Sequence, residues 1–508
     1  MKAGTAADGL RQERTARGVL AVVSLCLALI GFIACGPVLL TVMDGTAYLA
    51  LLVLAALVSV LLVRAAHSPS RLDYMAPIHL FTLWFVLDYA AGPVWAMFNL
   101  YSPTVSLEAA FRDRAMVNRS LIYVDVAYLC VLLGYYSRIG PMLSRRLPQL
   151  HAVWPASTLL PKVLVAYAFG MAIKLYGYSQ GVNAQGFSVG SPAEFWAYDY
   201  IQNFSRFTLY AMAIMFLTGV WKESAVSRTA FGVMVLAEFG SAVMATSKSA
   251  VMLVLFVLLM ASNYRHRLLR ARHFLLLFVL ALLVVFPLMD MYKGQHYQVL
   301  GYHLEPGEQS GFMGEDLGQQ LSFRSAAEAV RRELIELSEM SIGDYFQKTI
   351  DVMGGRQNQV NHLANIIANT PDPFPYRMGA DLPWILPDAT IPRLIWPGKV
   401  EPQDGNIYDE DYIGQAVGAG AGPNFMADLY MNFGWVGIPI GMFLVGFMMR
   451  FVYEYLIVNQ QAASPGVFYY LFLVIPLLDT YVETSIAGLA TSIKLTLYLT
   501  TLHLFMLL

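Results

Sequence analysis

The sequence predicts an all-α polytopic membrane protein with about 12 transmembrane helices and one large extracytoplasmic loop. Hydrophobic residues make up 57% of the chain and charged residues only 13%, about half the charged fraction of a typical soluble domain. The mean hydropathy is +0.53, and apolar runs long enough to cross a bilayer recur along the chain. These observations favour one membrane domain over several soluble domains.

Crossing a hydrocarbon core of about 30 Å takes roughly 20 apolar helical residues. The predicted spans lie near residues 18–43, 46–63, 78–100, 120–137, 159–179, 206–221, 229–246, 249–263, 273–291, 433–457, 466–485 and 487–507. We do not expect the first to be a cleaved signal, because more apolar sequence follows Ala34-Cys35-Gly36. The predicted organisation is a transmembrane bundle over 1–291, a large loop over 292–432 and C-terminal spans over 433–508.

The distribution of basic residues predicts the orientation of the spans. Lys and Arg concentrate in cytoplasmic loops, and alternate connections of this chain are rich in them if the N-terminus lies inside. This alternation predicts that both termini are cytoplasmic and that the loop over 292–432 lies outside, in the periplasm or its equivalent. The net charge is -2 and no basic tract occurs, so we expect no nucleic-acid partner.

Several charged residues fall within or at the ends of predicted spans, and each is a candidate for function or for a buried ion pair. They are Asp88, Asp125, Lys174, Glu238, Lys248 and Asp479. Lys248 differs from the others because it sits in Thr246-Ser247-Lys248-Ser249, a tight turn predicted to face the same side as the large loop. A functional role is therefore favoured for Lys248.

The large loop begins with helical patterns and continues with an irregular segment. Apolar residues recur at helical spacing over 322–341, which predicts an amphipathic helix on the membrane surface or bundle rim, or one that packs on its own loop. More helix is predicted over 342–370, with an interruption at Gly354-Gly355. Residues 371–422 are rich in Pro and Gly and are predicted to be irregular.

The residue types in this loop suit an anionic, sugar-bearing substrate. Arginine binds phosphate through its fork and lysine as a point charge, and the loop supplies Arg356, Arg377, Arg393 and Lys399. Trp384, Trp396 and Tyr408 could stack on sugar rings, and carboxylates could act as general bases. Any one of these arginines alone could instead form a surface salt bridge. The interpretation depends on their clustering with aromatic residues.

Other chemistries are less well supported by the sequence. It has no Walker loop, no Gly-x-Ser-x-Gly and no paired-histidine metal motif. The acidic turn Asp409-Glu410-Asp411 could bind a divalent cation together with Asp404, but a solvated turn is favoured. We therefore expect neither a metal nor a cofactor.

Three segments resemble the bacterial oligosaccharide repeat-unit polymerases, the Wzy-type O-antigen polymerase family. Ile391-Pro392-Arg393-Leu394-Ile395-Trp396-Pro397-Gly398-Lys399 resembles the family's proline–arginine–tryptophan–proline–lysine stretch. Asn424 to Gly437 resembles its acidic–tyrosine–asparagine–phenylalanine–glycine segment, in which Asp428 stands where the family often has Glu. Ala245 to Ala250 resembles its short basic outer turn, with Lys248 in place of the expected Arg.

The resemblance implies a metal-independent, inverting glycosyltransferase of the membrane-embedded, GT-C-like architecture in the inner membrane. Its substrates would be polyprenyl-diphosphate-linked oligosaccharides, as donor and as acceptor. A chain-length regulator and a flippase are further partners that it implies. It assigns diphosphate binding to Arg356, Arg393, Lys248, Arg377 and Arg206. For the catalytic base it ranks Asp428 before His362 and Glu410.

Two alternatives stay open at this point. An O-antigen-ligase-like transferase uses the same donor chemistry and shares the architecture. A transporter or flippase for lipid-linked sugars belongs to a different class, but transporters tend to show repeated halves, and no repeat is evident in this sequence.

Overall fold

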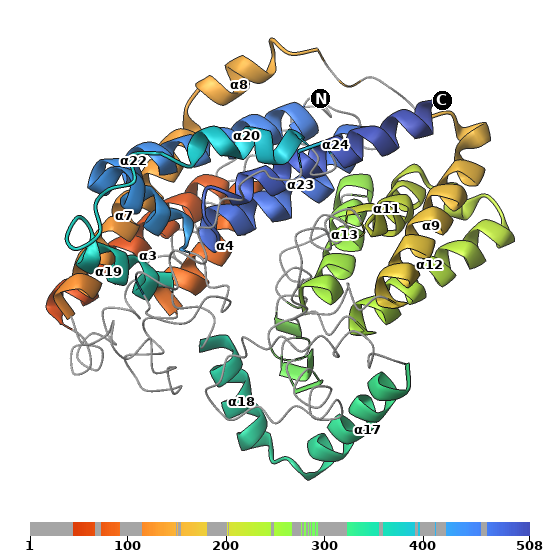
Figure 1. Cartoon of the computed structure of the whole chain (residues 1–508), viewed down its shortest axis with the longest axis horizontal. Coiled ribbons are helices and arrows are strands. Elements are labelled where there is room, and N and C mark those ends of the chain that lie inside the picture. The colour runs from red at the N-terminus through yellow and green to blue at the C-terminus, as the bar shows by residue number, and fades with distance from the viewer. Residues whose placement is uncertain are drawn as a thin grey trace, which may run out of the picture. The chain divides into compact units, whose positions relative to one another are not determined.

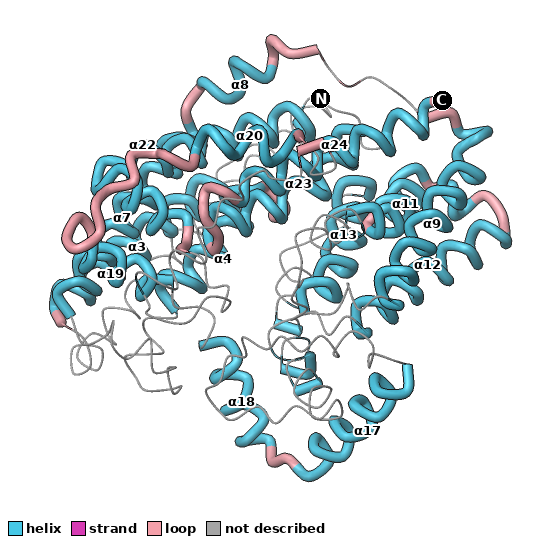
Figure 2. The backbone as a smooth tube through the Cα atoms, in the orientation of Figure 1, coloured by secondary structure: helices cyan, strands magenta, loops and turns pink. Residues whose placement is uncertain are grey.

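A computed structural model of the chain describes residues 44–66, 73–91, 114–148, 154–179, 203–244, 248–266, 323–354, 359–391, 423–458 and 465–508, together with isolated positions between them. Within these ranges the protein is helical and contains no strand (Figures 1 and 2). The helices form two compact units. Unit 1 is built from residues 1–140, 354–378 and 424–450, and unit 2 from 141–353, 379–423 and 451–508.

Six helical stretches in the described residues are long and apolar enough to cross a membrane. They are Ala115–Ser144, Thr158–Gly177, Ala225–Met244, Phe425–Val458, Pro465–Val482 and Gly488–Leu507. Two shorter apolar helices cover Gly45–Leu61 and Ala250–Arg265. All eight coincide with predicted spans, which supports a multi-pass membrane protein. The total of about twelve and the division at residues 291 and 432 stay predictions.

Unit 1 contains α3 (Gly45–Ala66), α4 (Pro77–Val86) with the π-helical turn η1 (Leu87–Ala91), α7 (Arg114–Tyr136), α19 (Gln359–Asn369) and most of α22 (Phe425–Tyr453). Its aromatic core includes Phe81, Phe85, Tyr89 and Tyr128, which are fully buried. The Thr82 hydroxyl lies 2.7 Å from the Tyr128 hydroxyl, so α4 and α7 share a buried polar contact.

Helices α7 and α22 pack closely because glycines remove the side chains at their crossing. A Cβ atom at Gly446 would collide with the Val131 carbonyl oxygen, and one at Gly134 with the Phe443 carbonyl oxygen. Gly446 of α22 meets Val131 of α7, and four residues farther along both helices Arg450 lies over the Tyr135 ring. The two helices therefore run in the same direction.

Unit 2 contains α9 (Ala156–Ser179), α11 (Phe207–Thr218), α12 (Ala225–Met244), α13 (Lys248–His266), α23 (Pro465–Val482) and α24 (Gly488–Leu507). The Lys174 ammonium on α9 lies 2.9 Å from the Glu238 carboxylate on α12 and 3.3 Å from the Ser241 hydroxyl. Both charged side chains are largely buried. The sequence left two interpretations for Lys174 and Glu238, a functional role or a buried ion pair. The structure supports the buried ion pair.

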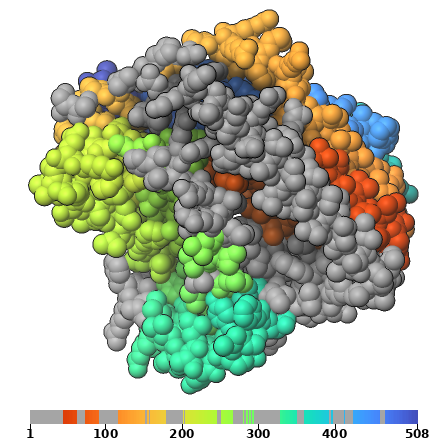
Figure 3. Space-filling view, turned by 180° about the vertical axis from the view of Figure 1, so that it is seen from behind, coloured from red at the N-terminus to blue at the C-terminus, as the bar shows by residue number. Residues whose placement is uncertain are grey.

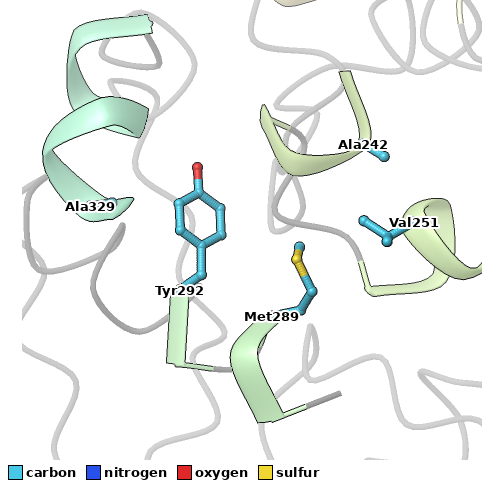
Figure 4. Packing of buried hydrophobic residues seen from close by; sticks show 5 residues of the cluster. All are labelled: Ala242, Val251, Met289, Tyr292 and Ala329. Atoms are coloured by element: carbon cyan, nitrogen blue, oxygen red, sulfur yellow. The ribbon is translucent and has the colours of Figure 1, made fainter. Parts of the chain in front are cut away.

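The loop segment after the ninth predicted span forms α17 (Phe323–Glu339) and α18 (Ile342–Gly354), which lie on the surface (Figures 1 and 3). Ala329 of α17 packs in a cluster with Ala242 and Val251, at the ends of α12 and α13, and with Met289 and Tyr292 (Figure 4). This cluster packs α17 against the ends of α12 and α13. Leu334, in contrast, is 62% exposed, so the apolar stripe of α17 is not its packing face.

The prediction that residues 371–422 are irregular was wrong in part. Leu382–Thr390 form helix α20 in unit 2, with a proline in the first turn, where its missing N–H costs no hydrogen bond. α20 packs against α24, and the Asp388 carboxylate lies 3.3 Å from the Lys494 ammonium. Tertiary packing and this ion pair stabilise a helix that the proline content had concealed.

Candidate active site

The central feature of the site is a sharp bend in α22 at Gly434. This residue has φ 62° and ψ -155°, a conformation that favours glycine, and it divides the helix into 425–433 and 435–453. A Cβ atom at Gly437 would collide with the Leu429 carbonyl oxygen, eight residues earlier. In a straight helix residues eight apart are separated by about 12 Å. The segment 425–433 therefore folds back against the start of the long span.

Asn424 fixes the beginning of this short segment. Its side-chain oxygen accepts a hydrogen bond from the Ala427 N–H at 2.9 Å, which caps the helix. Its side-chain amide donates to the Gln359 carbonyl oxygen at 2.7 Å. One buried amide thus joins the first turn of α22 to the first turn of α19.

The chain that follows α19 fixes the end of the same segment. The N–H of Arg377 donates to the Met431 carbonyl oxygen, and the N–H of Met378 donates to the Asn432 carbonyl oxygen, both at 3.0 Å. Carbonyl groups at the end of a helix lack partners within it, so these two bonds complete the helix terminus. The Tyr376 ring covers Gly434, where a Cβ atom would lie 3.1 Å from the ring.

Asp428 lies inside the segment held in this way. The side chain is 2% exposed, and its Oδ1 atom accepts a hydrogen bond from the Asn432 amide at 2.7 Å. The same amide donates to the Asp428 carbonyl oxygen at 3.0 Å. This hydrogen bond orients the carboxylate, a group of the kind that serves as a general base.

His362 lies in α19, one turn after Gln359. Burial lowers the pKa of its imidazole from the ordinary value of 6.5 to about 4. The ring is therefore neutral at neutral pH, where it can form hydrogen bonds but contributes no positive charge. The adjacent Asn361 is 1% exposed, and neither polar atom of its amide has a hydrogen-bond partner among the described residues.

Three of the predicted site residues, His362, Arg377 and Asp428, belong to unit 1. Unit 2 contains Trp384, which is 43% exposed, and Trp396, whose ring centroid lies 6.1 Å from that of Trp384. Arg206 precedes α11 in the same unit. The side chain of Lys248, at the start of α13, lies outside the described residues. So do all atoms of Arg356, Arg393, Tyr408 and Glu410.

Sequence reasoning missed the residues that position Asp428. Asn424 directly precedes the apolar segment and is a recognisable helix-capping residue, so local sequence could have identified it. Asn432 contacts Asp428 across one helical turn of the same segment. The role of Tyr376 at Gly434 depends instead on a contact between segments far apart in the chain, which a single sequence does not reveal. No group of three or more His, Cys, Asp or Glu side chains suited to a metal occurs among the described residues. Asp404 and Asp409–Asp411 are not among them.

Comparison with known families identifies this part of the chain. Residues 327–506 match the family model of the O-antigen polysaccharide polymerase Wzy. The match supports the predicted resemblance to Wzy-type polymerases over these residues, which include α19, α22 and the last two spans. No curated protein and no solved structure shows a significant match.

Proposed function

We propose that this protein elongates a polysaccharide by transferring a growing glycan from polyprenyl diphosphate to a lipid-linked repeat unit, since residues 327–506 match the family model of the O-antigen polysaccharide polymerase Wzy. The acceptor is the terminal sugar of that repeat unit, itself linked to polyprenyl diphosphate. The observation that carries the proposal is the buried carboxylate of Asp428 in the folded-back segment of α22, within the matched residues.

The proposed reaction is a single displacement with inversion. A hydroxyl oxygen of the acceptor sugar attacks the anomeric carbon of the donor. The new glycosidic bond forms while the bond from that carbon to the diphosphate oxygen breaks, and its electron pair leaves with the polyprenyl diphosphate. The acceptor hydroxyl gives its proton to a base. No metal, redox step or other co-reactant is needed to balance this reaction.

Asp428 is the first candidate for the base. Its orientation is fixed by Asn432, and the helix that bears it is fixed at both ends. Because the side chain is 2% exposed, the acceptor must displace covering groups to reach it, and this would also exclude water from the reaction. His362 is a weaker candidate, since its low pKa opposes proton uptake. Glu410 is the third candidate from the sequence.

Positive charge would stabilise the leaving diphosphate, and stabilisation of this kind is commonly the main source of rate acceleration. The candidates are Arg356, Arg393 and Lys248, followed by Arg377 and Arg206. For Arg377 the backbone contact with Met431 supports a defined position beside the segment that bears Asp428. Trp384 and Trp396 would bind sugar rings, and the Asp388–Lys494 ion pair supports a fixed position for their helix on α24.

We also propose the location and partners implied by the family. The protein would lie in the inner membrane with cytoplasmic termini and residues 292–432 in the periplasm, as the basic residues indicate. The parallel directions of α7 and α22 fit this topology, in which both enter from the outer side. A GT-C-like arrangement of about twelve spans, a flippase and a chain-length regulator belong to the same proposal.

The test is polymerisation by purified full-length protein in lipid nanodiscs with a synthetic polyprenyl-diphosphate-linked repeat unit. We expect a ladder of longer glycans and release of polyprenyl diphosphate. Arg393→Ala should abolish the ladder while thermal stability is retained, and Arg146→Ala, on the predicted inner side, should leave it unchanged. A normal ladder from Arg393→Ala would contradict the role of Arg393. Transfer of finished glycan to another acceptor would identify a ligase, and movement of substrate without a new glycosidic bond would identify a transporter.

A further inference from the structure

Arg119 near the start of α7 is a cation to which the proposed reaction has so far assigned no role. It is exposed, and its Nε atom donates a hydrogen bond to the Tyr123 hydroxyl at 3.2 Å. The guanidinium carbon lies 5.7 Å from the centroid of the Tyr123 ring. Among the described residues, no hydrogen bond is formed by its two terminal Nη groups. One side of the guanidinium is thus oriented by a neutral partner while its fork stays available.

A row of tyrosines connects this arginine with the bend in α22. The ring of Tyr123 lies 5.9 Å from that of Tyr430, and Tyr430 lies 6.2 Å from Tyr376, measured between centroids. Tyr376 covers Gly434, and Tyr430 follows Asp428 by two residues on the same short helical segment. All of these residues belong to unit 1. Arg119 is therefore attached to the same packed structure as the candidate base.

The chemistry of this arrangement suits a diphosphate. A planar guanidinium with a free fork binds phosphate oxygens with two parallel hydrogen bonds. The Asn118 amide, on the preceding residue, donates to the Asp44 carboxylate at 3.2 Å, which ties the start of α7 to the start of α3. The backbone that carries Arg119 is thus supported by its neighbours. Tyr123 and Tyr376 are partly exposed and present aromatic rings beside it.

We propose that Arg119 binds the diphosphate of a lipid-linked oligosaccharide substrate, with Tyr123 as the residue that positions its guanidinium. This proposal rests on the proposed function. It adds a phosphate-binding residue that directly precedes the fourth predicted span to a site so far assigned to the large loop, Lys248 and Arg206. The same guanidinium chemistry could take the phosphate of a bulk anionic phospholipid, and the experiment must separate the two sources.

The experiment measures polymerisation and ligand binding by the full-length protein in nanodiscs. The probes are a fluorescent short-chain polyprenyl diphosphate carrying one repeat unit and the corresponding monophosphate. In phosphatidylcholine nanodiscs, Arg119→Gln should weaken binding of the diphosphate probe and raise its KM by about tenfold, the effect of losing a charge-assisted hydrogen bond. Arg119→Lys should recover part of this loss, and the monophosphate probe should respond less.

Tyr123→Phe keeps the ring and removes only the hydroxyl that holds Arg119, so it should cause a smaller increase in KM with kcat unchanged. Arg331→Gln is the matched control, since this α17 arginine is 74% exposed and pairs only with Glu328 among the described residues. Unchanged diphosphate affinity in a folded Arg119→Gln protein would overturn the proposal. So would a defect that appears only in phosphatidylglycerol nanodiscs, which would assign Arg119 to phospholipid. If the wild-type protein itself makes no polymer, the proposed function fails first.

Discussion

Two ion pairs of unit 2 contrast with two charged side chains of unit 1 that are hydrogen-bonded to neutral groups. In unit 2, Lys174 pairs with Glu238 and Lys494 pairs with Asp388, so each charge lies beside one of opposite sign. In unit 1, the Asp428 carboxylate accepts a hydrogen bond from the neutral Asn432 amide, and the Arg119 guanidinium donates one to the neutral Tyr123 hydroxyl. Removing one member of a buried ion pair is costly, because the other charge stays buried. A hydrogen bond with a neutral group orients a charged side chain without neutralising its charge.

The largest effect that would test this contrast is expected from Asp428→Asn. The substitution keeps the size of the side chain and removes its ability to accept a proton, so kcat should fall by about 10²- to 10⁴-fold. Asp428→Glu should retain part of the activity. Thermal stability and single-turnover polymerisation are measured together. A parallel loss of stability and activity would show that Asp428 is only a structural residue of the bend.

The second effect concerns the ion pair in unit 2. Lys174→Met should destabilise the protein by about 3 kcal/mol, because it leaves the Glu238 carboxylate buried without its cation. The double variant Lys174→Met/Glu238→Leu should recover most of this stability. Turnover per folded molecule should stay at the wild-type level in both. Reduced turnover in the well-folded double variant would indicate that this pair also has a functional role.

The third effect concerns the glycine crossing of unit 1. Gly446→Ala should destabilise the protein by about 2 kcal/mol, because its new methyl group meets the Val131 carbonyl oxygen and forces α7 and α22 apart. Gly240→Ala in unit 2 is the matched control, since a Cβ atom there meets nothing within 4 Å. The control should be neutral or slightly stabilising. Equal melting temperatures for the two variants would contradict the close approach.

The smallest effect is a pH dependence of stability. The imidazole of His362 has a pKa of about 4 in the folded protein and near 6.5 in the unfolded chain, so the unfolded chain binds the proton more readily between these values. Stability should therefore fall as the pH is lowered from 7 to 5, by at most about 2 kcal/mol. Melting temperatures measured between pH 7 and pH 5 should depend less on pH in His362→Gln than in the wild-type protein. If both proteins show the same pH dependence, the imidazole is not buried as described.

Local patterns in the sequence predicted most of the described helices. The interruption expected at Gly354-Gly355 separates α18 from α19, and the span expected over 433–457 corresponds to the second part of α22. These features depend on hydrophobic runs and helix breakers, which act over a few residues. The prediction failed at α20, where packing on α24 and the ion pair with Lys494 outweigh the effect of two prolines.

The candidate site was predictable only in part, for the same reason. Asp428 was identified from a family resemblance. Its hydrogen bond with Asn432 spans one helical turn. Tyr376 reaches Gly434 from a segment far away in the sequence, and this contact leaves no local signal. The fold-back at Gly434 left no separate signal in hydropathy, since residues 425–453 are apolar on both sides of it. The residue types in the sequence indicated binding of phosphate and sugar. They did not indicate which of the candidate residues belong to the same compact unit.

The contacts that hold the short segment of α22 also have a consequence for the large loop. Met378 is hydrogen-bonded to the last turn of this segment, and Asn424 caps its first turn. The chain between Met378 and Asn424 is therefore attached at both ends to the same nine-residue helix. Residues 379–423 are thus an insertion with fixed attachment points, and they include Trp384 and Trp396. They also include Arg393 and Glu410. The proposed sugar contacts and a proposed diphosphate contact are thus joined at fixed points to the helix that bears Asp428.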